Sequence, residues 1–155
     1  MQSFKDNEGQ IWNVALTIGK VRQLREKLGL DLLDGQHHLQ VMNSLTDRLA
    51  FVFLLVEEQA KDKGLDADEL EMRFYGDGVA TEASICFLRE LENFFQRLGQ
   101  TVQSRLTKSS IEAMGKARSR LDEMLQNGKV DSLLAEATKE MEEMMAGNDG
   151  SGSSN

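Results

Sequence analysis

Residues 49–56, LAFVFLLV, form the longest apolar run of this 155-residue chain. A helix needs roughly 20 apolar residues to cross a bilayer, so a run of eight is too short for a membrane span. The run lies inside a longer pattern, residues 39–63, in which apolar residues recur at the spacing of a helix. We therefore expect a buried central helix that ends at Gly64 and has a candidate break at Asn43–Ser44.

The N-terminal residues alternate with a period of two, which is typical of β-strands. Phe4 leads into a turn sequence, Asp6–Gly9, in which Gly9 can adopt the left-handed conformation of a tight turn. We predict a two-stranded hairpin. Because an isolated hairpin is marginal in water, one of its faces should lie on helices. The residues expected on that face are Trp12, Val14 and Leu16.

Three further segments carry helix signals, and proline, which would interrupt a helix, is absent from the chain. Thr17 is a suitable N-cap for the first helix. Asp66 followed by Glu69 matches a capping box at the start of the second. The predicted helices run from Thr17 to Gly29, from Asp66 to Gly76 and from Val79 to Leu98.

From Gly99 onward aromatic residues disappear, and methionine becomes the main large apolar residue beside leucine. Ser109 with Glu112 matches another capping box, and Asn127–Gly128 is a turn signal. We therefore expect two helices with narrow apolar stripes, joined as a helical hairpin. The last residues are polar and rich in glycine, which predicts a disordered tail.

These patterns predict a mainly α protein with an N-terminal β-hairpin, a small α+β fold. In it, a helical bundle is followed by a C-terminal helical hairpin. Residues 1–98 would form the β-hairpin and helical core domain, residues 99–146 a C-terminal helical extension, and residues 147–155 the disordered tail.

The chain has 18 basic and 26 acidic residues, a formal charge of −8. An acidic protein has no general attraction to phosphate backbones or anionic lipid, so nucleic acid and membranes are unfavourable partners. The N-terminus lacks the features of a secretion signal, and the single Cys86 cannot form an internal disulfide, which together favour the cytoplasm. A set of C-terminal basic residues is expected to pair with the acidic helix that follows it: Arg105, Lys108, Lys116, Arg118 and Arg120.

No pattern is typical of a catalytic, cofactor or metal site, so we predict no enzyme and no bound cofactor. The adjacent His37–His38 lack the i, i+4 spacing of a helical zinc site, and we expect them in an exposed turn. Cys86 lies among apolar residues and should pack as a small hydrophobe. Trp12 could stack on a base or sugar, but its alternation with Val14 and Leu16 favours core packing.

Methionine and leucine on the C-terminal helices form the strongest candidate binding surface, because flexible thioethers suit a variable apolar helix. The alternative is that these helices pack on each other or on a second copy, and self-packing is the favoured reading. Phe94 and Phe95 are adjacent, so one of them should lie outside the core stripe and contact a partner. The candidate partner-binding residues are Phe94, Met124, Leu125, Leu133, Leu134, Met141, Met144 and Met145.

Two stretches carry a family resemblance. The first contains Phe4, Asn7, Gly9 and Trp12, followed by Leu30-Asp31-Leu32-Leu33-Asp34. The second runs from Gly64-Leu65-Asp66 through Glu69 to Leu91-Glu92-Asn93-Phe94-Phe95. Over residues 3–98 the chain resembles a family of small phage and prophage proteins that are similar to tail assembly chaperones. Residues 99–146 extend beyond that resemblance.

The resemblance implies a protein of the host cytoplasm that keeps a helical client, the tape-measure protein, soluble until the tail tube polymerises. Two alternatives stay open. One is a structural or scaffolding oligomer of a phage particle that self-associates through the terminal helices. The other is a regulator that binds nucleic acid through basic residues 116–120, although the overall acidity and the lack of a helix-turn-helix pattern weigh against it.

Overall fold

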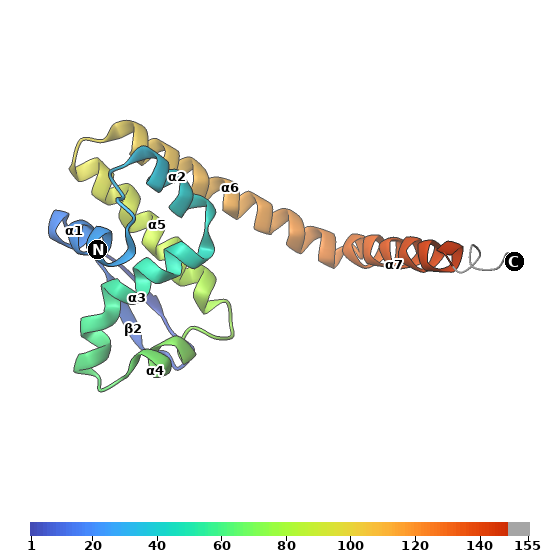
Figure 1. Cartoon of the computed structure of the whole chain (residues 1–155), viewed down its shortest axis with the longest axis horizontal. Coiled ribbons are helices and arrows are strands. Elements are labelled where there is room, and N and C mark those ends of the chain that lie inside the picture. Colours follow the sequence, from blue (N-terminus) through green and yellow to red (C-terminus); the bar gives the residue numbers. More distant parts are fainter. Residues whose placement is uncertain (149–155) are drawn as a thin grey trace, which may run out of the picture. The chain divides into compact units, whose positions relative to one another are not determined.

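The computed structural model describes residues 1–148, which form a two-stranded sheet and seven helices (Figure 1). The chain divides into unit 1, Met1–Glu112, and unit 2, which begins at Ala113. The predicted mainly α fold with an N-terminal β-hairpin is confirmed. The elements are β1 (Gln2–Lys5), β2 (Ile11–Val14), α1 (Ile18–Leu28), α2 (Gly35–Asn43), α3 (Leu45–Asp62), α4 (Ala67–Met72), α5 (Val79–Arg97), α6 (Thr101–Gln126) and α7 (Lys129–Asn148).

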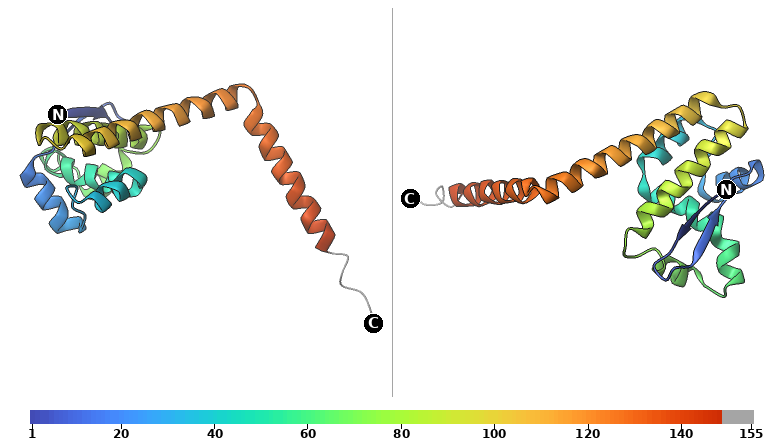
Figure 2. Two further views of the ribbon diagram at one scale, coloured as in Figure 1. Left: turned by 90° about the horizontal axis from the view of Figure 1, so that it is seen from above. Right: turned by 180° about the vertical axis from the view of Figure 1, so that it is seen from behind.

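Asp6 organises the turn between the antiparallel strands β1 and β2. Its Oδ1 accepts the backbone N–H groups of Glu8 and Gln10, and its Oδ2 accepts the indole N–H of Trp12 at 2.9 Å. Gly9 has a φ of 82°, a left-handed conformation that glycine adopts without steric cost. The hairpin lies alongside α5 (Figure 2), and Trp12 is fully buried. The prediction that Trp12 packs in the core is therefore confirmed.

Helices α3 and α5 pack together at the centre of unit 1. Phe51 of α3 stacks on Phe87 of α5 with ring centroids 5.4 Å apart, and both rings are fully buried. Burying a phenylalanine side chain contributes about 1.5–3 kcal/mol, so each ring of this pair stabilises unit 1 by about that amount. The central helix thus lies where the apolar run predicts it.

The chain bends between α2 and α3 at the predicted break. Ser44 ends α2, and its hydroxyl accepts a backbone N–H in the first turn of α3. The buried Arg48 donates to the carbonyls of Val41 and Met42 at the end of α2, and to the hydroxyl of Ser84 in α5 at 2.6 Å. These bonds satisfy carbonyl groups that the end of a helix leaves free.

No single helix among residues 1–148 is long and apolar enough to cross a membrane. Helices α2 and α3 reach the required length and composition only when taken together, and they are bent by 101°.

Two of the predicted helix starts are also confirmed. The hydroxyl of Thr17 accepts a backbone N–H of α1, and Asp66 and Glu69 form the reciprocal bonds of a capping box at the start of α4. Helix α4 ends at Met72, earlier than the predicted Gly76.

The first part of α6 belongs to unit 1. The hydroxyl of the buried Ser104 donates to a backbone carbonyl of α5, and Thr107 Oγ1 lies 2.9 Å from Nε2 of His38 in α2. Only 1% of His38 is exposed, so the prediction that it lies in an exposed turn is wrong. Because these polar side chains tie α6 to α2 and α5, unit 1 extends to Glu112, beyond the boundary expected at Gly99.

Unit 2 contains the rest of α6 and α7, joined at Asn127–Gly128 as predicted. Ser109 does not begin a helix, because α6 is continuous from Thr101 to Gln126. The last part of α6 and α7 diverge from their turn (Figure 2), so among residues 1–148 the two helices do not pack on each other as expected. Helix α7 extends through Asn148, and the rest of the predicted tail, residues 149–155, lies outside the described residues.

The predicted ion pairs between α6 and α7 do not form either. None of the five C-terminal basic residues has an ion-pair partner in the part of the chain that the structure describes. Three of these basic residues lie in unit 2. The acidic residues expected to pair with them lie on α7, which diverges from the last part of α6. The residues concerned are Arg105, Lys108, Lys116, Arg118 and Arg120.

Candidate functional site

Helix α7 presents a row of uncovered apolar side chains. Leu134, Met141 and Met145 are separated by seven and four residues, which places them on one helix face. All members of the row are exposed, with 75% of the Met144 surface accessible. We call this surface the α7 stripe; it consists of Leu133, Leu134, Met141, Met144 and Met145.

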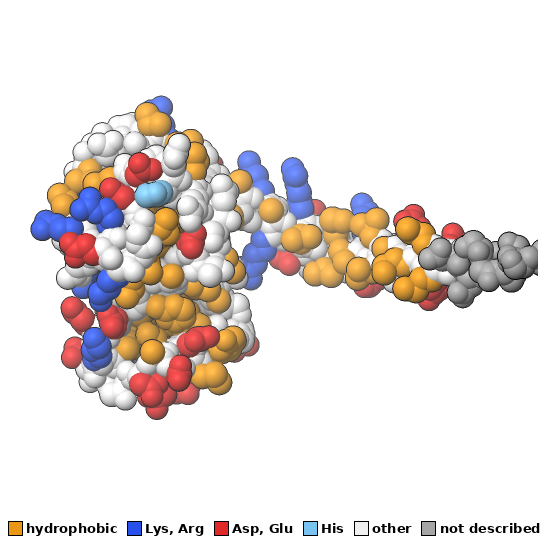
Figure 3. Space-filling view, in the orientation of Figure 1, with side chains coloured by type: hydrophobic (Ala, Val, Ile, Leu, Met, Phe, Trp, Pro, Cys, Tyr) orange, Lys and Arg blue, Asp and Glu red, His pale blue; other side chains and the backbone are white. Residues whose placement is uncertain are grey.

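The last part of α6 continues the apolar surface of unit 2. Leu121 and Leu125 lie four residues apart and are both exposed, whereas Met124 is half-buried. Apolar side chains cover much of both helices in the face shown in Figure 3. Seven of the eight predicted partner-binding residues, all but Phe94, therefore lie in unit 2 with at least part of their surface accessible.

The opposite face of α7 is acidic. Glu136 and Glu143 lie about 180–200° around the helix from Leu134, at 100° per residue. Helix α7 has five acidic and two basic residues, and none of them forms an ion pair within residues 1–148. Helix α7 is therefore amphipathic, and the apolar face of an amphipathic helix normally packs against another element.

Phe94 does not belong to this surface, because only 3% of it is exposed. The guanidinium of Arg97 lies 5.9 Å from the centre of its ring, and Phe95 packs edge-on against His38 at 4.8 Å. The expectation that one of the two phenylalanines lies outside the core is wrong. Helix α5 is covered on several sides, by the hairpin, by α3 and by His38, so both rings are buried.

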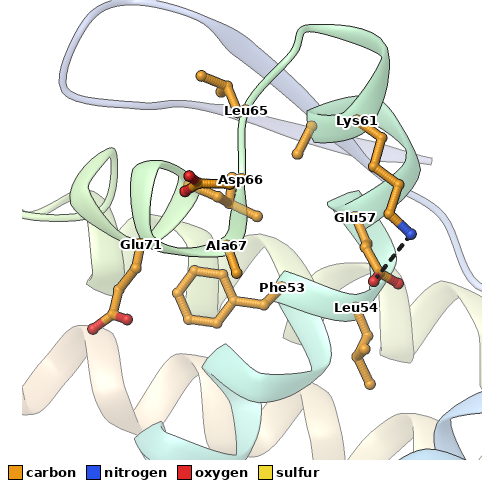
Figure 4. A pocket seen from close by; sticks show the side chains of 10 residues that line it. Phe53, Leu54, Glu57, Lys61, Leu65, Asp66, Ala67 and Glu71 are labelled. Atoms are coloured by element: carbon orange, nitrogen blue, oxygen red, sulfur yellow. Dashed lines mark ion pairs between the residues drawn. The ribbon is translucent and has the colours of Figure 1, made fainter.

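Unit 1 contains a groove between α3 and α4 that the sequence did not reveal (Figure 4). Its volume is about 430 Å³. The buried Ala60 and Leu70 and the half-buried Phe53, Leu54 and Leu65 form its apolar lining. We call it the α3–α4 groove. Phe53 and Leu54 belong to the run expected to be wholly buried, but both are half-buried.

Glu90 is a buried charge that the sequence also did not reveal; it is 1% exposed. Its Oε1 accepts the backbone N–H of Leu16 at 2.9 Å and a guanidinium N–H of Arg97 at 3.2 Å, and its Oε2 lies 2.9 Å from the α-amino group of Met1. Burial opposes ionisation of Glu90, but these donors and charges outweigh it and lower the pKa of the carboxyl. Its partners tie the end of β2 to α5, which is a structural role.

The remaining candidates for chemistry do not form a reactive site. Cys86 is buried as expected, and burial raises the pKa of its thiol to about 11, so little of the nucleophilic thiolate exists at neutral pH. Within the described residues no group of three or more His, Cys, Asp or Glu side chains could hold a metal ion.

No protein-family model, curated protein or solved structure matches this chain. Two uncovered apolar surfaces, the α7 stripe and the α3–α4 groove, are the candidate binding sites of the described residues.

Proposed function

We propose that this protein binds an amphipathic helix of a client protein through unit 2 and thereby keeps the client from aggregating. The observation that carries the proposal is the uncovered α7 stripe, because single-chain proteins seldom leave so many large apolar side chains in water. A client helix laid along the stripe would bury apolar surface on both partners.

The composition of the stripe suits a variable client. Three of its five members are methionine, whose unbranched side chain adapts to differently shaped apolar surfaces. The carboxylates on the opposite face of α7 would remain in water after binding and keep the complex soluble. Affinity would come from many modest apolar contacts instead of one deep pocket.

The resemblance over residues 3–98 supplies a particular setting for this activity. In that setting the protein is a tail assembly chaperone of a phage or prophage, it acts in the host cytoplasm, and its client is the tape-measure protein. Such a client is a long helical protein whose apolar stripes would otherwise associate before the tail tube forms.

Co-expression with a tape-measure protein encoded beside this gene tests the proposal. The full chain should keep that client in the soluble fraction, and the double substitution Leu134→Lys with Met141→Lys should abolish the effect, because two charges then interrupt the stripe. The control is Glu136→Lys, which changes the net charge by the same two units on the opposite face. Equal client solubility with the double variant and with the unmodified chain would refute the proposal.

A second candidate function is a structural oligomer, and the spacing of residues on α7 favours it. Val130, Leu134, Ala137, Met141 and Met144 alternate at four- and three-residue steps, the spacing of a coiled-coil seam. Sedimentation of the protein without any client distinguishes the two functions: a stable oligomer that the same double substitution dissociates would favour the structural role.

A further inference from the structure

The α3–α4 groove is held open by the packing around it. The ring of Phe53 packs against Phe74 with centroids 4.6 Å apart, and the backbone N–H of Leu65 donates to the carbonyl of Ala60 at 2.9 Å. The capping box fixes the start of α4 at the mouth of the groove. A partner would therefore meet a preformed surface and would lose little free energy in ordering it.

The groove is lined by the ion pair of Glu57 and Lys61 and by two further carboxylates, Asp66 and Glu71, and more acidic side chains lie close by in the chain. Residues 57–71 include seven acidic and two basic side chains, a formal charge of −5. Glu57 pairs with Lys27 and Lys61, and Glu58 pairs with Lys20. The other five carboxylates have no ion-pair partner among residues 1–148; they are Asp62, Asp66, Asp68, Glu69 and Glu71.

The apolar walls and the acidic border lie next to each other. In Figure 3 apolar side chains fill the surface between α3 and α4, and acidic side chains gather beside them over α4. Glu71 lines the mouth of the groove itself (Figure 4). A helix that placed apolar side chains in the groove would bring its flanking positions close to Asp66 and Glu71, which line it.

We propose that the α3–α4 groove binds a client helix whose apolar stripe is flanked by lysine or arginine. This inference rests on the proposed function in one respect, that the partners are amphipathic helices. The apolar stripe fills the groove, and the basic flank meets the carboxylates that the protein itself leaves unpaired. Complementary charge of this kind speeds association and rejects partners of the wrong sign.

Two designed peptides test the charge preference. Each is a helix of about 18 residues, five turns, with leucine at every third or fourth position; one carries lysine at the flanking positions and the other carries glutamate. The lysine peptide should bind the full-length protein about tenfold more tightly than the glutamate peptide at low salt. The difference should shrink as salt is raised, because exposed charges are screened. Equal affinities for the two peptides would overturn the proposal.

Substitutions at the groove locate the binding site. Glu71→Lys, at an exposed position, should lower the affinity for the lysine peptide about three- to tenfold and raise the affinity for the glutamate peptide. Tyr75→Phe is the matched control, because it removes the hydrogen bond between Tyr75 and Glu71 but keeps the carboxylate. Leu65→Ser should weaken both peptides, since it removes part of the apolar wall. The control should bind both peptides as the unmodified chain does. If Glu71→Lys and Leu65→Ser also bind both peptides with unchanged affinity, the peptides bind elsewhere and the inference fails.

A third peptide, residues 108–126 of this chain, tests the competing occupant. These residues carry Lys116, Arg118 and Arg120 beside Leu121 and Leu125, so a second copy could in principle supply the basic helix. Binding of this peptide in the groove, together with a dimer that Glu71→Lys dissociates, would overturn the assignment to a client. Because Glu71 lies in unit 1, these results leave the test of the α7 stripe unaffected.

Discussion

Glu90 shows how a single carboxylate joins two elements that are distant in sequence. It is ionised in the interior because Leu16, Arg97 and the α-amino group of Met1 surround it, and these partners lower the pKa of its carboxyl. A lowered pKa means that ionised Glu90 stabilises the fold above its ordinary value near 4.5, and that this contribution is lost as the pH falls through the lower value of the folded state.

Glu90→Gln should therefore lower the free energy of unfolding by roughly 1–3 kcal/mol at pH 7, because the amide cannot balance the neighbouring positive charges. The difference from the unmodified protein should shrink as the pH falls below 4.5. Urea denaturation at several pH values measures both effects. Glu82→Gln, at an exposed site on the same helix, is the control and should change stability little. A loss that stays constant at every pH would contradict this account of Glu90.

His38 has the opposite chemistry, since burial lowers the pKa of its imidazole and keeps the ring neutral. The hydroxyl of Thr107 donates to the carbonyl of Gln103 at 2.7 Å, so it can only accept from His38. The neutral ring therefore carries its proton on Nε2.

The unmodified protein should accordingly lose stability as the pH falls below about 6.5, where the unfolded chain binds a proton that folded His38 resists. The free energy of unfolding can fall by up to about 1.4 kcal/mol for each pH unit. His38→Gln keeps a side-chain N–H near Thr107 and should flatten this part of the profile. Urea denaturation between pH 7.5 and 5.5 provides the measurement, and an equally steep profile in the variant would assign the effect to another group.

At the scale of elements, the junction of α2 and α3 depends on Arg48. Replacing it with methionine would remove the guanidinium N–H groups from the carbonyls of Val41 and Met42 and from the hydroxyl of Ser84. The carbonyl of Val41 would keep only the longer bond from a backbone N–H, at 3.3 Å. We expect Arg48→Met to lower the free energy of unfolding by roughly 2–4 kcal/mol, and Arg48→Lys to recover only part of that loss, because one ammonium group cannot reproduce the planar fork. Arg22→Met, at an exposed site on α1, is the control. Chemical denaturation measures the free energy of unfolding of each variant. A loss for Arg48→Met as small as that of the control would contradict this role.

The sequence predicted those elements whose signals are local. Gly9 and Asp66 mark a turn and a helix start through bonds to residues close by in the chain, and both predictions are confirmed. Ser109 and Glu112 show the same pattern but do not begin a helix, since the residues before them are already helical. The preceding turns of α6 are held by Ser104 and Thr107, whose burial is invisible to a search for apolar spacing.

The candidate surfaces were predictable to different degrees for a related reason. The α7 stripe follows from helical spacing within one segment, so its residues could be named in advance. The α3–α4 groove depends on where a six-residue helix lies on α3, and no local pattern encodes that placement. Phe94 was misplaced because the number of neighbours that cover α5 depends on the tertiary fold.

For the whole molecule, the division into two units predicts independent stability of the first. A chain that ends at Glu112 retains the core of unit 1 and should unfold in urea with the same midpoint as the full chain, as followed by tryptophan fluorescence of Trp12. A chain that ends at Gln100 lacks Ser104 and Thr107 and should be less stable by roughly 2 kcal/mol or more. A large loss on removal of unit 2 alone would contradict the division.

The abundance of methionine in the α7 stripe also makes the surface sensitive to oxidation. Conversion of a thioether to a sulfoxide turns a flexible apolar side chain into a polar one, and enzymes can reverse the reaction. Met141, Met144 and Met145 are exposed, whereas Met42 is buried in unit 1. Dilute hydrogen peroxide should therefore modify the stripe long before the core, so that an oxidised protein would keep its fold but lose the client binding that we propose for the stripe, until a reductase restores the thioethers.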